Sequence, residues 1–228
     1  GAYGMTEALH RDVQALRGNV FEVIARLREA GVFFALNHLL HFYQGQISLD
    51  AYLTLLEAVP AVEAGNGTML SSHNALVKHL ALEWMPARAA RRLTIIGGSD
   101  AHTLRRVGRT WTEAAGRTRE EFLASLREGG GRPGGRHGTM LTTAGDAYGV
   151  IARYIASLAG FGPRDHRSVH RAGCLAFSVL SLPFQFTPLL LAAVAKRRER
   201  RQVAATRAHL LAAGPFALPA SLDLEAGA

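Results

Sequence analysis

The sequence contains one cysteine, Cys174, among its 228 residues. One thiol cannot form an internal disulfide, so a disulfide-stabilised secreted domain is excluded and a reducing compartment is expected. No charged segment followed by an apolar run opens the chain, and we therefore expect a cytoplasmic protein rather than a secreted one. Aromatic residues make up only 7% of the sequence and do not interleave with the basic clusters, which argues against a nucleic-acid-binding protein.

Acidic residues are also scarce, with 18 Asp and Glu against 26 Lys and Arg, which gives a net charge of +8. Nearly all the basic residues are arginine. Such a positive field favours anionic partners such as phosphate esters, nucleic acid or lipid headgroups. A compositional bias toward arginine and alanine is the alternative interpretation. Apolar residues are plentiful at 48%, enough for the core of one sizeable domain.

Helical and extended patterns alternate along the first half of the chain. Spacing of apolar residues predicts helices at 6–30, 48–58 and 71–84, and short apolar runs predict strands at 32–36, 61–64 and 93–96. This alternation indicates a parallel α/β fold, in which the carboxyl ends of the strands converge and form sites. The polar residues at those strand ends are Asn37, His38, Glu63, Asn66, Asp100 and His102.

The third predicted strand leads into Gly97-Gly98-Ser99-Asp100-Ala101-His102-Thr103. In an extended segment, residues two apart lie on the same side, so Asp100 and His102 could both reach one cation. The two glycines would let backbone or ligand come close. The alternative interpretation is that Ser99 and Asp100 cap a following helix and that His102 is an ordinary loop residue.

Downstream, Thr118 is a good cap for a helix ending near Glu128, because Glu121 follows three residues later. The glycine- and arginine-rich residues 129–138 are interpreted as a loop, in which His137 is a weak candidate for lining the site. From Asp146 onward helical periodicity replaces the alternation. We therefore expect a domain at residues 1–140 and a helical extension at 141–228.

Residues 172–195 contain no charged side chain and are followed by the basic run 196–201. About 20 apolar residues are needed to cross a bilayer, so the length permits a span. Prolines at 183 and 188 and basic residues on both flanks argue against one. Two shorter helices broken near Pro183, packed on the domain or lying in a membrane interface, fit equally well. Contact with a membrane surface through 172–201, peripheral or integral at its inner face, is therefore a hypothesis.

The stretch Ile96-Gly97-Gly98-Ser99-Asp100-Ala101-His102-Thr103 resembles the Gly-Ser-Asp-x-His motif of PHP-domain metallophosphoesterases, the polymerase and histidinol phosphatase superfamily. Residues 35–38 resemble the strand whose histidine binds metal in that family, and residues 62–67 resemble the strand that follows it. The similarity covers about residues 1–140. It implies the C-terminal part of a distorted (β/α)7 barrel, followed here by a helical extension.

The resemblance implies that His38, Asp100 and His102 are metal ligands. Such mixed histidine and carboxylate sets suit Mn, Fe or Zn. The metal would activate a water molecule and neutralise the phosphoryl oxygens of a phosphorylated small molecule or an oligonucleotide. Residues expected to support the metal ligands or to contact the substrate are Asn37, Glu63, Asn66, Arg109 and His137.

Two departures from the family pattern qualify this hypothesis. Leu39 stands where the family usually has proline, and no His-x-His strand precedes His38. The only earlier histidine, His10, lies on the predicted surface of a helix. We therefore expect the C-terminal half of a PHP-type phosphoesterase, with weak metal binding and little or no activity. The alternatives are a non-catalytic scaffold whose C-terminal helices bind a membrane or a partner protein, and a nucleic-acid-binding domain, which is the least supported.

Overall fold

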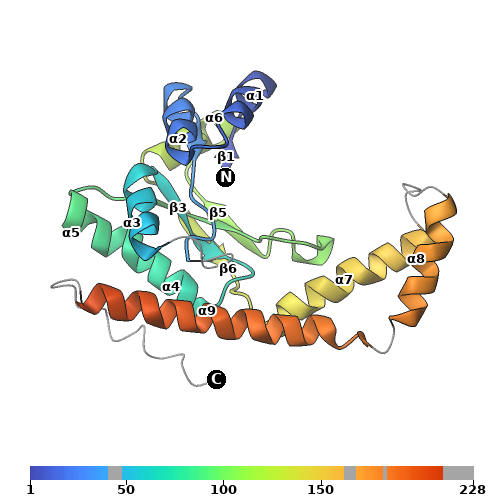
Figure 1. The fold of residues 1–228 in the computed structure, drawn as a ribbon. Helices are drawn as coiled ribbons and strands as arrows, with labels where there is room; N and C mark the ends of the chain where they lie inside the picture. Colours follow the sequence, from blue (N-terminus) through green and yellow to red (C-terminus); the bar gives the residue numbers. More distant parts are fainter. Residues whose placement is uncertain (41–47, 162–167, 182–183, 213–228) are drawn as a thin grey trace.

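The computed structural model describes residues 1–40, 48–161, 168–181 and 184–212 of a mixed α/β protein (Figure 1). Its strands are β1 (Ala2–Tyr3), β2 (Phe33–Phe34), β3 (Ala61–Asn66), β4 (Thr94–Gly98), β5 (Thr110–Glu113) and β6 (Arg132–Gly135). Its α-helices are α1 (Glu7–Ala15), α2 (Val20–Glu29), α3 (Leu49–Ala58), α4 (Ser71–His79), α5 (Met85–Ala89), α6 (Arg119–Arg127), α7 (Met140–Ala159), α8 (Ser168–Leu180) and α9 (Thr187–Ala212).

Strands β3 and β4 form a parallel pair in which Val62 lies opposite Ile95 and Asn66 lies opposite Gly98. On the other side of β3, Leu36 forms a parallel bridge to Val62. Three segments therefore run side by side in the same direction, as the alternating sequence pattern predicts. Their carboxyl ends meet at one edge, where the candidate residues lie.

The expected barrel is not shown. The strands of the described residues form three two-stranded sheets, and none of these sheets closes. Strands β1 and β2 are antiparallel, and β5 pairs antiparallel with β6, which occupies part of the predicted loop 129–138. Thr112 of β5 contacts β4 through its side chain, since Gly97 N donates to Thr112 Oγ1 at 2.8 Å and Thr112 Oγ1 donates to Gly97 O at 2.7 Å. Strands β4 and β5 are therefore joined by hydrogen bonds to a side chain and belong to different sheets.

Helix boundaries follow the capping residues. The single helix predicted at 6–30 is wrong, because the chain turns at residues 16–19 and Asn19 starts α2 by accepting from Phe21 N at 3.0 Å. Thr118 caps α6 as predicted, and Ser48 caps α3, which matches the helix predicted at 48–58. The helix predicted to end at Trp84 continues through a π-helical turn, Leu80–Trp84, into α5.

The largest apolar cluster lies between the β3–β4 pair and the helices that connect these two strands. Leu210 of α9 is 3% exposed and belongs to this cluster. Figure 1 shows α7 leading away from the strands to α8, while α9 returns along α4. Helix α9 therefore packs on the core, whereas α8 contacts α7. A domain boundary near residue 140 stays a prediction.

The apolar stretch 172–195 is divided between α8 and the start of α9. The predicted break at Pro183 lies outside the described residues. None of the helices in the described ranges combines the length and apolar character needed to cross a membrane.

Gly97 offers a test of the packing between the sheets. A Cβ at this position would lie 2.5 Å from Trp111 O and 3.2 Å from Gly65 O. We expect Gly97→Ala to lower the free energy of unfolding by ~1–3 kcal/mol, measured by urea denaturation. Gly145→Ala is the matched control, because nothing lies within 4 Å of its added Cβ and α7 should gain up to ~1 kcal/mol. Equal stability of the Gly97 variant and the wild type would contradict the packing described.

Candidate functional site

Three predicted residues from three segments meet at the carboxyl edge of the parallel strands. His38 Nδ1 lies 3.7 Å from Asp100 Oδ2, and His38 N donates to Glu63 Oε2 at 3.4 Å. His38 and Asp100 have φ angles of 52° and 46°, and Ala90 is the one other described non-glycine residue with positive φ. Backbone strain of this kind gathers at functional sites, where the surrounding structure holds it in place.

Asp100 and His102 are brought together differently from the prediction. The extended-segment argument is wrong, because β4 ends at Gly98 and Asp100 is left-handed. His102 Nδ1 instead lies 3.0 Å from the carbonyl oxygen of Asp100, to which it donates. The helix-capping alternative is not supported either, since the following 3-10 turn has Thr103 at its N-cap position.

A buried polar network supports the Asp100 carboxylate. Glu63 is 5% exposed, and its Oε2 accepts from Asn66 Nδ2 at 2.9 Å. Thr68 Oγ1 lies 2.8 Å from Asn66 Oδ1 and 2.7 Å from Asp100 Oδ2, with one proton to donate between them. Burial raises the pKa of the Glu63 carboxyl above its ordinary value. The network fixes the positions of Asp100 and of the His38 backbone.

The remaining predicted residues lie farther out. The side-chain oxygen of Asn37 is buried and has no hydrogen-bond partner. His137 is exposed, and its Nδ1 accepts from Asn74 Nδ2 at 2.9 Å, so Asn74 links it to the network. Arg109 is exposed and donates to Arg105 O at 3.0 Å, away from the carboxylates.

Arg106, which was not predicted as a site residue, contacts both the end of β3 and helix α7. Its Nη2 donates to Gly67 O at 2.5 Å, and its Nε lies 3.6 Å from Asp146 Oδ2. Thr103 Oγ1 donates to Asp146 Oδ1 at 2.8 Å. Asp146 belongs to α7, and nothing in the local sequence indicates that this helix returns to the strand ends.

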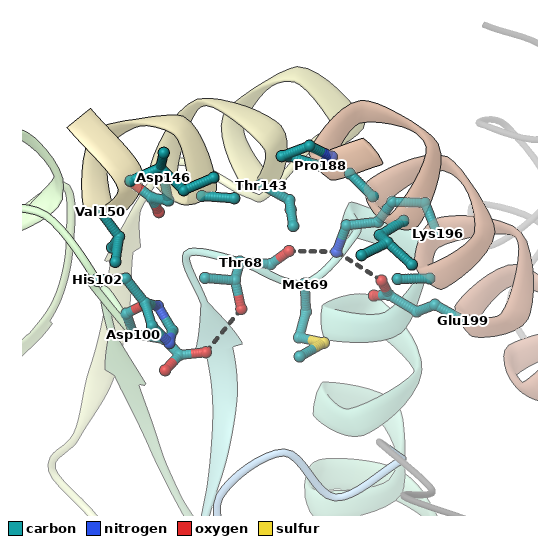
Figure 2. A pocket seen from close by; sticks show the side chains of 15 residues that line it. Thr68, Met69, Asp100, His102, Thr143, Asp146, Val150, Pro188, Lys196 and Glu199 are labelled. Atoms are coloured by element: carbon teal, nitrogen blue, oxygen red, sulfur yellow. Dashed lines mark hydrogen bonds and ion pairs between the residues drawn. The ribbon is translucent and has the colours of Figure 1, made fainter. Parts of the chain in front are cut away.

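A buried ion pair on α9 also reaches the site (Figure 2). Lys196 Nζ lies 2.7 Å from Glu199 Oε2, and both residues are less than 7% exposed. Lys196 Nζ donates in addition to Thr68 O, and Glu199 Oε1 accepts from Leu70 N at 2.6 Å. In the sequence Lys196 is the first residue of the basic run 196–201, whereas in the structure it attaches α9 to the segment that carries Thr68.

These elements line a pocket of about 620 Å³ that is partly open to solvent. Asp100 and His102 line one side, and residues of α7 and α9 line the other (Figure 2). His38 is not among the lining residues, although its ring lies beside Asp100. The pocket therefore opens next to the candidate ligands.

The candidate ligands have side chains that can bind a metal ion, but fewer of them lie together than one ion needs. Metal bonds of ~2.0–2.2 Å place two ligands of one ion ~3–3.5 Å apart, close to the 3.7 Å between His38 and Asp100. Catalytic centres use about three protein ligands per ion. No three or more His, Cys, Asp or Glu side chains gather as a metal site within the described part of the chain. The described residues thus provide an incomplete donor set.

Residues 86–130 match the family model described as PHP-associated. These residues are therefore similar to a PHP-associated region. This region runs from α5 to the end of α6 and includes Asp100 and His102. The match supports the C-terminal portion of a PHP-domain protein, in agreement with the sequence motif. Searches of curated proteins and of solved structures found no match to the chain.

The Lys196–Glu199 pair provides a test of protein stability. Lys196→Met leaves Glu199 buried without its cation, and we expect a loss of ~3–5 kcal/mol in the free energy of unfolding. The double variant Lys196→Met/Glu199→Met should recover much of that loss, because no charge stays unpaired. Arg200→Met, exposed on the same helix, is the control and should change stability by no more than ~0.5 kcal/mol. Urea denaturation that gave equal losses for Lys196→Met and Arg200→Met would refute the buried pair.

Proposed function

We propose that this chain forms part of a metal-dependent phosphoesterase, in which His38 and Asp100 bind a divalent Mn, Fe or Zn ion. The observation that carries the proposal is the 3.7 Å approach of His38 Nδ1 to Asp100 Oδ2, in a chain with a PHP-associated region. A bound divalent ion supplies an activated water and neutralises phosphoryl charge. The substrate is a phosphorylated small molecule or an oligonucleotide.

His102 is the third ligand in this proposal. Its Nδ1–H donates to the carbonyl oxygen of Asp100, which selects the tautomer with Nε2 as the ligand atom. Thr68 holds the Asp100 carboxylate, and Glu63 holds the backbone of His38. With these donors alone, metal binding is weak and hydrolysis slow.

Metal binding tests the proposal directly. We expect His38→Ala and Asp100→Ala to weaken Mn²⁺ binding at least ~10-fold in isothermal titration calorimetry, because even residues that only support ligands cost that much. His10→Ala, on the exposed face of α1, is the control and should bind Mn²⁺ like the wild type. Unchanged Mn²⁺ affinity in Asp100→Ala would rule out the assignment of this ligand.

Hydrolysis provides the second test. Mn²⁺-dependent phosphate release from p-nitrophenyl phosphate is expected to be slow in the wild type and absent in Asp100→Ala. Metal binding without any Mn²⁺-dependent release would favour the non-catalytic scaffold.

A second candidate function is contact with an anionic membrane surface through 172–201. Large apolar side chains on and after α8 are at least 60% exposed: Phe177, Leu180, Phe184 and Phe186. Exposed arginines follow on α9: Arg197, Arg198, Arg200 and Arg201. Figure 1 places α8 at the outer end of α7, away from the strands. Apolar side chains next to a basic cluster suit the interface of an anionic bilayer.

Vesicle co-sedimentation tests this contact. Reversing Arg197 and Arg201 to Glu should weaken binding to phosphatidylserine vesicles by at least ~30-fold, since each arginine near the surface contributes ~1 kcal/mol. The control reverses Arg11 and Arg17, which are exposed near the other end of the chain, and should leave binding unchanged. Equal binding to zwitterionic and anionic vesicles would contradict the electrostatic part of the proposal.

A further inference from the structure

The pocket beside Asp100 and His102 has an apolar wall that comes from outside the matched region 86–130. Most of this wall belongs to α7 and α9, with Met69 added from the segment that precedes α4. Its apolar members are Met69, Ala147, Val150, Ile151, Pro188, Leu191, Ala192 and Ala195. A volume of about 620 Å³ lies within the ~300–1,000 Å³ typical of pockets for small organic ligands.

Most polar side chains of the pocket already have partners. Lys196 and Glu199 bind each other and the backbone, and Asp146 is held by Thr103 and Arg106. The Thr143 hydroxyl is buried in the pocket wall with no hydrogen-bond partner. A ligand rich in hydroxyl groups, such as a sugar, would therefore lose hydration without gaining equivalent hydrogen bonds.

The charges of the lining residues argue against a polyanionic ligand. Three carboxylates, Asp100, Asp146 and Glu199, line the pocket, and Lys196 is the lining lysine that faces them. Arg106 adds one cation beside Asp146. With no positive excess along the apolar wall, a chain of phosphates would be repelled there. A phosphoryl group fits only at the Asp100 and His102 end, where a divalent ion would neutralise it.

We propose that this pocket binds the apolar organic group of a phosphate monoester, an alkyl or aryl chain, and that α7 and α9 thereby determine the substrate class. The inference rests on the proposed function for the position of the phosphoryl group. The alkyl or aryl group of the ligand lies along Val150, Ile151 and Leu191. The Thr143 hydroxyl offers one hydrogen bond to a polar atom within that group.

Chain-length dependence of binding tests this assignment. Ethyl, butyl and octyl phosphate are titrated into the full chain by calorimetry, with and without Mn²⁺, and n-octanol serves as the probe without phosphate. We expect affinity to rise ~4-fold per added methylene, equivalent to ~0.8 kcal/mol per buried CH₂. Ala195→Trp should abolish the rise by filling the pocket, whereas Ala204→Trp, exposed on α9 outside the pocket, should retain it.

Each outcome decides one of the two proposals. Equal affinity for ethyl and octyl phosphate, or a rise that Ala195→Trp and Ala204→Trp retain alike, overturns the pocket assignment. If Ala195→Trp abolishes the rise in affinity with chain length and no Mn²⁺-dependent hydrolysis is detected, the pocket assignment is supported and the proposed phosphoesterase activity is rejected. If Ala195→Trp fails to fold, Leu191→Gln with Leu190→Gln as its control gives the same comparison, because only Leu191 lines the pocket.

Discussion

Parallel pairing of β3 with β4 is the constraint on which the site depends. The register that sets Asn66 opposite Gly98 brings Thr68 to the Asp100 carboxylate, and the bridge from Leu36 to Val62 brings His38 to the same edge. The pairing requires small residues at the end of β4. A Cβ on Gly98 would lie 2.6 Å from Glu63 Oε1 and would displace the carboxylate that holds His38.

Helix α9 makes the C-terminal extension part of this edge. Burial of Lys196 and Glu199 carries a desolvation cost, which their mutual attraction and their backbone partners offset. In return, the pair fixes where α9 crosses the segment at residues 68–70. The apolar side of the pocket depends on that position. A region outside the PHP-associated match therefore shapes the space next to Asp100 and His102.

The site combines a partial donor set with a formed pocket. His38, Asp100 and His102 have the chemistry of metal ligands, while the polar groups around them are mostly satisfied by one another. Two of the three are held in left-handed backbone conformations. Strained backbone of this kind persists only where the surrounding structure maintains it, as the proposed binding of a metal by these residues would require.

Features that depend on neighbours along the chain could be predicted from the amino-acid sequence. Thr118 was predicted as a helix cap and residues 48–58 as a helix from a few residues each, and the alternation of elements predicted parallel strands with polar ends. Strand β6, Arg132–Gly135, was missed because its proline and glycines disfavour a strand, and it forms only against β5. Contacts between distant segments were decided by the tertiary structure alone. Glu199 lies 129 residues after Leu70, and no local pattern encodes a hydrogen bond across that separation.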